Sequence, residues 1–218
     1  MKKRITMRKR IAFSAVTLAL AAAGPVTPAA AASSPANGPK DVKVDIAAVN
    51  GSGCKPGSAA VSLASDRDSF SVTYSDYTAQ AGGSTTPADG RKTCRVNLQV
   101  LVPEDFTYAV SAVDYRLRAD LQSGAKAVQR ASYYFQTDSE TKTATHNLTG
   151  PYNKNFEVSE KIPEDQLAWK PCGERLNFNI TTELRVDKGT SDASKVSTIT
   201  LNSGNGAKVN YHLAWKPC

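Results

Sequence analysis

Residues 176–186 read LNFNITTELRV, and their alternation of apolar and polar side chains decides the fold class. The apolar side chains fall at alternate positions and comprise Leu176, Phe178, Ile180, Leu184 and Val186. Because successive side chains of a β-strand point to opposite faces, this stretch predicts a strand with one buried face and one polar face. One apolar face per strand is typical of an antiparallel sheet that is covered by a partner sheet.

The same two-residue period recurs along most of the chain. It is clear at 94–100 and 208–216, and further strands are expected at 42–49, 59–64, 69–77, 106–121, 125–136, 142–149 and 196–201. Within 106–121 the apolar phase changes, which predicts a β-bulge or bend near Ala112. No window has the pattern of an amphipathic helix. About ten short strands predict an all-β, antiparallel two-sheet sandwich, either Ig-like or jelly-roll-like.

The first 32 residues have the three parts of a secretory signal peptide. A basic head is followed by an apolar run from Ile11 through Ala23, and small residues precede Ser33. The apolar run of 13 residues is shorter than the roughly 20 that span a bilayer. We therefore predict a signal peptide at 1–32, a flexible lead-in at 33–40 and a single domain at 41–218, released extracellularly without a membrane anchor.

Loss of the signal peptide removes the basic character of the chain. The whole sequence carries 27 basic and 20 acidic side chains, a formal charge of +7. Residues 1–32 hold 6 of the basic side chains and none of the acidic ones, which leaves 21 against 20, or +1. A chain this close to neutral lacks the basic excess of nucleic-acid-binding proteins, so no nucleic-acid partner is expected.

All four cysteines lie in the predicted mature chain, at Cys54, Cys94, Cys172 and Cys218. An even number of cysteines in an exported chain predicts disulfides, because the compartment is oxidising. Four cysteines allow three pairings. Metal ligation is not expected, because the chain lacks C-x-x-C spacing and neighbouring histidines, and the sequence predicts no cofactor.

A six-residue repeat favours one of the three pairings. Residues 167–172 read LAWKPC, and residues 213–218 repeat them letter for letter, while the flanking sequences differ. We interpret the two copies as similar strand ends that lie side by side, each with an inward tryptophan. This arrangement favours a Cys172–Cys218 bridge, which leaves Cys54 to pair with Cys94.

Several short motifs resemble those of a known family. They are Gly-Ser-Gly-Cys at 51–54, Ser-Phe at 69–70, Val-Asp-Tyr-Arg at 113–116, Ala-Asp-Leu at 119–121, Gly-Pro-Tyr at 150–152, Trp-Lys-Pro-Cys-Gly at 169–173 and Trp-Lys-Pro-Cys at 215–218. Together they resemble an uncharacterised secreted family of actinobacteria and filamentous fungi, the domain-of-unknown-function family 4360. The resemblance covers almost the whole mature chain. It implies a small exported protein with paired cysteines, and it supplies no catalytic residues.

The sequence offers few groups for catalysis. Its two histidines are His146, which shares the phase of apolar neighbours and is interpreted as a hydrogen-bonded structural residue, and His212, interpreted as a solvated surface residue. Hydrolase and phosphate-binding motifs are absent from the sequence. A carboxylate-dependent hydrolase would use Asp114 and Asp120, although their alternation with arginines also predicts cross-strand ion pairs. A protease inhibitor would use the loop Gly51–Gly57.

The aromatic residues favour a binding role over catalysis. The chain has eight tyrosines and two tryptophans. If Tyr133 and Phe135 face the core, Tyr134 faces outward with Arg130 and Ser132, where it could stack on a sugar ring or enter a partner's pocket. We therefore predict a non-enzymatic extracellular binding protein that engages a polysaccharide or another secreted protein, with Tyr134 and Arg130 as candidate contacts.

Overall fold

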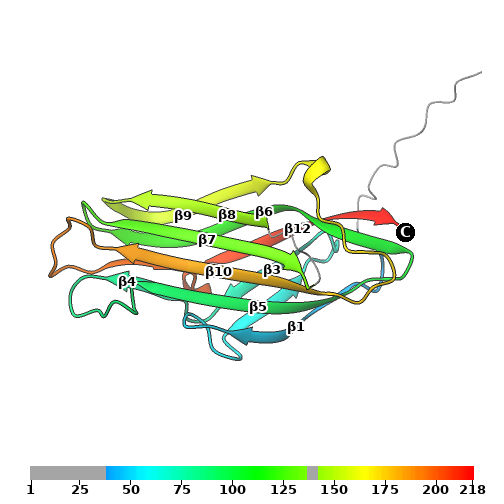
Figure 1. Ribbon diagram of the computed structural model, residues 1–218, viewed down its shortest axis with the longest axis horizontal. Helices are drawn as coiled ribbons and strands as arrows, with labels where there is room; N and C mark the ends of the chain where they lie inside the picture. The colour runs from blue at the N-terminus through cyan, green and yellow to red at the C-terminus, as the bar shows by residue number, and fades with distance from the viewer. Residues whose placement is uncertain (1–37, 137–141) are drawn as a thin grey trace, which may run out of the picture. The chain divides into compact units, whose positions relative to one another are not determined.

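The computed structural model describes residues 38–136 and 142–218, and this part folds into twelve strands (Figure 1). The five-stranded sheet has the order β1 (Lys43–Asn50), β5 (Arg91–Leu101), β10 (Asn177–Asp187), β7 (Lys126–Phe135) and β8 (Lys142–Thr149). The seven-stranded sheet has the order β2 (Ala59–Leu63), β3 (Ser69–Tyr74), β12 (Lys208–Pro217), β6 (Phe106–Leu121), β11 (Ser197–Thr200) and β4 (Thr78–Ala81), with β9 (Tyr152–Lys161) also paired to β6. The predicted signal peptide lies outside the described residues.

Both sheets are antiparallel throughout and bury one face each, so the predicted two-sheet sandwich is confirmed. Figure 1 shows β7, β10 and β5 side by side. The stretch that predicted the fold becomes the central strand β10, and Phe178, Ile180 and Leu184 are buried at 2% exposure or less. The predicted disulfides Cys54–Cys94 and Cys172–Cys218 are both formed.

Phe178 lies at the centre of an aromatic cluster between the two sheets. Its ring centroid is 5.3 Å from that of Phe135, 6.3 Å from Tyr133 and 6.4 Å from Phe70. Phe70 in turn stacks on Tyr211 at 5.0 Å. Most of the tyrosines contribute to this interior: Tyr74, Tyr77, Tyr108, Tyr115, Tyr133 and Tyr211 are all buried. The aromatic content that favoured a binding role therefore serves mainly to fill the core.

The predicted bulge in the long strand β6 is present one residue from its expected place. The register between β6 and β12 pairs His212 with Ala112 but Leu213 with Val110, so Ser111 is the extra residue. Such an insertion exchanges the faces of the strand. It explains how Tyr108 and Tyr115, which differ in sequence phase, both point into the core.

The interpretation of the six-residue repeat is half correct. The second copy is the end of β12 with Trp215 buried, and Trp215 pairs in register with Tyr108. The first copy is not a strand, although the backbone N–H of Lys170 donates to the carbonyl of Tyr108 at 3.0 Å. Trp169 is only half-buried, and the ammonium of Lys216 lies 4.2 Å from its ring centroid. The expected inward position of Trp169 is therefore wrong.

Burial of the tyrosines predicts unfolding in alkali. It raises the pKa of Tyr133 to about 12, and it raises the pKa of Tyr108 and Tyr211 further. The unfolded chain has tyrosine pKa values of about 10. The folded state therefore holds these protons more tightly, and the resulting stability is complete below pH 10 and is lost as the pH rises toward 12.

The measurement is a pH titration that follows tyrosinate absorbance and circular dichroism together. We expect most of the absorbance change to coincide with cooperative loss of the dichroism signal above pH 10. Gradual ionisation of all the tyrosines with the fold intact would contradict the burial described here.

Candidate functional site

The outer face of the five-stranded sheet carries mostly polar side chains, although Val128 of β7 lies on it opposite Arg185. Its three central strands contribute alternate residues: Arg91, Thr93, Arg95, Asn97 and Gln99 from β5, Asn177, Asn179, Thr181, Glu183 and Arg185 from β10, and Arg130, Ser132 and Tyr134 from β7. The register places Arg130 opposite Glu183 and Tyr134 opposite Asn179. The structure therefore brings the two predicted contacts, Tyr134 and Arg130, onto one face, with Tyr134 half-buried.

Asparagine side chains stiffen the middle of this face. The side-chain amide of Asn97 donates to Asn179 at 2.8 Å, and that of Asn177 donates to Asn97 at 2.9 Å. These bonds cross from β5 to β10 and back. They fix three amides in a row beside Tyr134, so polar groups are held in place before any ligand arrives.

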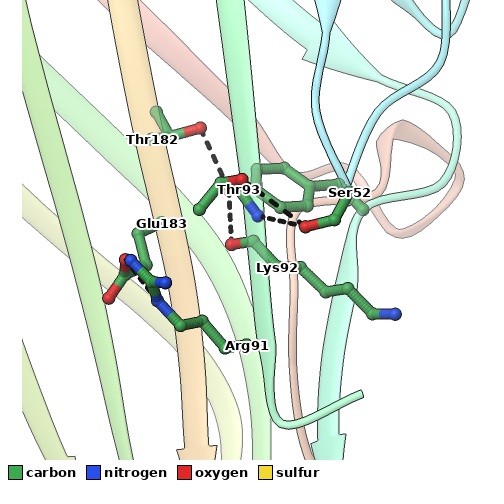
Figure 2. A network of polar contacts seen from close by, with 7 residues as sticks. Ser52, Arg91, Lys92, Thr93, Thr182 and Glu183 are labelled. Atoms are coloured by element: carbon green, nitrogen blue, oxygen red, sulfur yellow. Dashed lines mark hydrogen bonds and ion pairs between the residues drawn. The ribbon is translucent and has the colours of Figure 1, made fainter. Parts of the chain in front are cut away.

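Like charges meet at one end of the face. Arg185 of β10 lies directly opposite Arg91 of β5. Figure 2 shows Arg91 reaching across to the carboxylate of Glu183, to which its Nε donates at 2.8 Å. Within the described residues, the side chains of Arg185, Arg130 and Arg95 have no hydrogen bond or ion pair. Directly opposed like charges destabilise a sheet, so this arrangement has a cost that a bound anion would offset.

Arg91, Arg130 and Arg185 line a cleft of about 900 Å³. Its charged lining residues are Arg91, Arg130, Glu183, Arg185, Asp187 and Lys188. The walls come from two loops, residues 82–90 between β4 and β5 and residues 188–196 after β10. The cleft therefore combines four cations with two carboxylates at the edge of the polar face.

The two wall loops are tied to each other. The N–H of Gly83 donates to the carbonyl of Ala193 at 2.8 Å, and Gly82, at φ +98°, passes so close to Lys195 that a Cβ would lie 2.1 Å from its carbonyl oxygen. Asp89 braces the first loop by accepting hydrogen bonds from Thr86, whose hydroxyl is 2.7 Å away. Those bonds, with the nearby ammonium of Lys92, lower the pKa of Asp89 to about 2.

The outer face of the seven-stranded sheet differs, because Arg116 and Arg118 each have a polar partner on the neighbouring strand β9. Arg116 contacts Glu157 at 3.1 Å, and Arg118 donates to Asn153 at 2.5 Å. Asp114 accepts hydrogen bonds from Ser159 and His212, and the bond from Ser159 is the main reason that its pKa is lowered. Arg116 and Arg118 therefore already have side-chain partners, unlike Arg130 and Arg185 on the five-stranded sheet.

The structure does not join Asp114 and Asp120 into a catalytic pair. Six residues separate them on β6, which corresponds to about 20 Å along a strand. The paired carboxylates of glycosidases lie within about 10 Å of each other. Asp114 also stands between Ser159 and His212, so the serine bonds to the carboxylate and not to the imidazole that would activate it.

The two histidines are both held by hydrogen bonds. His146 points inward, as its sequence phase predicts, and lies 2.6 Å from Gln129 and 3.2 Å from Glu160. Its ring packs against Tyr115 at 5.1 Å. His212 is on the surface but is not simply solvated, because its Nε2 lies 2.6 Å from Asp114. Both histidines therefore join neighbouring strands.

The loop Gly51–Gly57 is exposed at its tip and anchored at its base. Cys54 is buried and bonded to Cys94, and the hydroxyl of Ser52 accepts the backbone N–H of Thr93 at 3.0 Å (Figure 2). The loop thus has the rigidity that an inhibitory loop needs. Its role as a protease inhibitor stays a prediction.

The sequence pointed to Arg130 but not to the rest of the cleft. Arg91, Arg185 and Lys188 were not singled out. Arg185 does lie in the polar phase of the strand that predicted the fold, so the alternation already placed it on an outer face. The missing information was the strand register, which sets Arg185 opposite Arg91.

Within residues 38–136 and 142–218, no helix is long and apolar enough to span a membrane. In the same part of the chain, no group of three or more histidine, cysteine or acidic side chains is arranged to hold a metal ion.

The solved structures to which this chain is similar include a bacteriophage protein, and that similarity is remote. The enzymatically active domain of bacteriophage CBA120 tailspike protein 4 is matched at 8% identity and a TM-score of 0.24. The match covers 82% of this chain but only 20% of that chain. A similarity this low supports no conclusion about fold or function.

Sequence comparison is more informative. A protein of Arthroderma benhamiae (strain ATCC MYA-4681 / CBS 112371), described as an uncharacterized secreted protein, is 28% identical over 185 residues, which are 84% of this chain and 75% of the relative. With its two disulfides, the present protein is likewise secreted. The family model described as "Domain of unknown function (DUF4360)" matches residues 40–218. The chain therefore belongs to this DUF4360 family.

Proposed function

We propose that this secreted protein binds an acidic polysaccharide through the outer face of its five-stranded sheet. The observation that carries the proposal is the placement of Arg91 directly opposite Arg185, with the unpaired Arg130 one strand away, on the floor of the 900 Å³ cleft. Guanidinium groups bind carboxylates and other oxyanions through paired hydrogen bonds. An anionic group seated between these arginines would relieve their repulsion.

The rest of the face supports a sugar polymer over a compact anion. From the cleft, the face continues through Thr93, Arg95 and Asn97 on β5 and past Tyr134 on β7. Amides and hydroxyls of this kind donate and accept hydrogen bonds with sugar hydroxyls, and a tyrosine ring can pack against a sugar ring. The outward residues along each strand present these groups in a line, which suits an extended chain.

The test is binding of the oxidised mature protein to soluble polymers, measured by calorimetric titration. The panel is polygalacturonate, which carries carboxylates, dextran sulfate, which carries sulfates, and neutral dextran. We expect binding to the acidic polymers that weakens as salt is added, and no binding to dextran.

A charge-matched pair of variants locates the binding face. Arg130→Gln combined with Arg185→Gln removes two cations from the cleft, and affinity should fall at least about tenfold, since each charge-assisted hydrogen bond contributes about 1.5 kcal/mol or more. Arg116→Gln combined with Arg118→Gln removes two cations from the opposite sheet and should leave affinity unchanged. Equal losses in the two variants, or no binding to any acidic polymer, would refute the proposal.

A further inference from the structure

A second hollow lies at the other end of the same face. It has a volume of about 280 Å³, and its polar lining residues are Gln99, Glu104, Lys170, Glu174, Arg175 and Asn177. Gln99 and Asn177 are register partners, as are Arg91 and Arg185 in the cleft. Eight residues of each strand separate the two pairs, so the hollow and the cleft are about 27 Å apart along one continuous surface.

Lys170 is the unusual member of this lining. The residue is only 4% exposed, and its ammonium donates to the carbonyl oxygens of Pro171 and Glu174, each at 2.8 Å. An ammonium has three protons to donate, and these two bonds use two of them. Within the described residues, no carboxylate lies within 4.0 Å of it. Burial lowers the pKa of Lys170, and the negative charge of Glu174 offsets part of that shift.

A buried ammonium with no carboxylate in direct contact is costly, and the cost falls when an anion pairs with it. The hollow beside Lys170 has room for a small ligand. Arg175 adds a second cation whose side chain is exposed and unpaired within the described residues. A carboxylate that accepted a hydrogen bond from each group would use the third proton of the Lys170 ammonium and pair with the Arg175 guanidinium.

The remaining lining selects the kind of anion. Glu104 and Glu174 bring two negative charges against the two positive ones, so a multiply charged phosphate would be repelled. Carboxylates also accept hydrogen bonds from hydroxyl groups, and the amides of Gln99 and Asn177 can donate or accept them. The hollow therefore suits a singly charged ligand that carries several hydroxyls.

We propose that this hollow is a subsite for one uronic acid unit, with its carboxylate bound by Lys170 and Arg175. This subsite rests on the proposed function, because the uronic acid unit would belong to the same acidic polysaccharide that the arginine cleft binds. Two linked sites on one surface make the affinity for a long polymer exceed that for a single sugar.

The six-residue repeat supplies a matched control. Lys170 and Lys216 occupy the same position in the two copies of LAWKPC, but Lys216 is exposed and lies over the ring of Trp169. Lys170→Gln removes the buried ammonium, whereas Lys216→Gln removes an equal charge outside the hollow. Because Lys170 also braces the turn at Pro171 and Glu174, Arg175→Gln is the second variant, since Arg175 is exposed and its replacement leaves the turn intact.

The experiment titrates galacturonate, glucose 6-phosphate and galactose into the oxidised mature protein, followed by ligand-observed NMR, and then repeats the polygalacturonate calorimetry. We expect galacturonate alone to bind. Lys170→Gln and Arg175→Gln should each weaken its binding about tenfold or more, and Lys216→Gln should bind as the wild type does.

The outcomes separate this proposal from the proposed function. If polygalacturonate binding depends on Arg130 and Arg185 while galacturonate binding is absent or is unchanged in Arg175→Gln, the subsite is refuted and the proposed function stands. If galacturonate binding depends on Arg175 but no acidic polymer binds, the subsite stands and the proposed function is refuted. Preference for glucose 6-phosphate would refute the assignment of a carboxylate ligand.

Discussion

Replacing Phe178 with alanine is expected to lower the free energy of unfolding by about 3–5 kcal/mol, the usual cost of removing a large aromatic side chain from a core. Phe178 is 2% exposed and lies on the central strand β10. Its ring contacts rings from both sheets, including Phe135 on its own sheet and Phe70 on the opposite one. Small movements cannot close a cavity bounded by two sheets, so the loss should lie in the upper part of that range.

Urea unfolding followed by tryptophan fluorescence measures the change. The control is Tyr134→Ala, which removes an aromatic side chain from the outer face of the same sheet and should cost less than about 1 kcal/mol. A cost for Phe178→Ala no larger than the control's would contradict the packing of the two sheets around this residue.

Removing either disulfide is expected to destabilise the protein by about 4 kcal/mol, according to the chain-entropy model for loops of this length. The bridges close loops with sequence separations of 40 and 46 residues. Their exposure differs, however: Cys54 and Cys94 are at most 3% exposed, whereas Cys172 and Cys218 are exposed. A reductant should therefore reach Cys172–Cys218 first, while the protein is still folded.

The cost is measured on the double variants Cys54→Ala with Cys94→Ala and Cys172→Ala with Cys218→Ala. The order of reduction is measured by alkylation and mass spectrometry after brief exposure to a mild reductant. Reduction of Cys54–Cys94 before Cys172–Cys218, or a double variant as stable as the wild type, would contradict this account.

Strand alternation predicted the fold class well because a strand that buries one face has an apolar residue at every second position. A strand with both faces partly exposed has a less regular alternation. The edge strand β9 was missed for this reason, since every residue of Tyr152–Lys161 is at least partly exposed. The short strand β4 (Thr78–Ala81) was missed because four residues are too few to establish a period.

The candidate site was only partly predictable, because strand register is set by packing over the whole domain. The sequence placed Arg130 and Tyr134 on one outer face, and the structure agrees. It could not show that Arg185 faces Arg91, because β5 and β10 are about ninety residues apart in the chain. The position of Lys170 was also not predictable, because the two identical hexapeptides adopt different structures.

Amide chemical-shift mapping with a galacturonate oligosaccharide tests most directly whether the protein binds acidic polysaccharide through the outer face of its five-stranded sheet. The account predicts shifts along β5, β10 and the outer residues of β7, from the cleft at Arg91 and Arg185 to the hollow at Gln99 and Asn177. Shifts concentrated on β6, β9 and β12 of the opposite sheet, with none on β5 and β10, would contradict it.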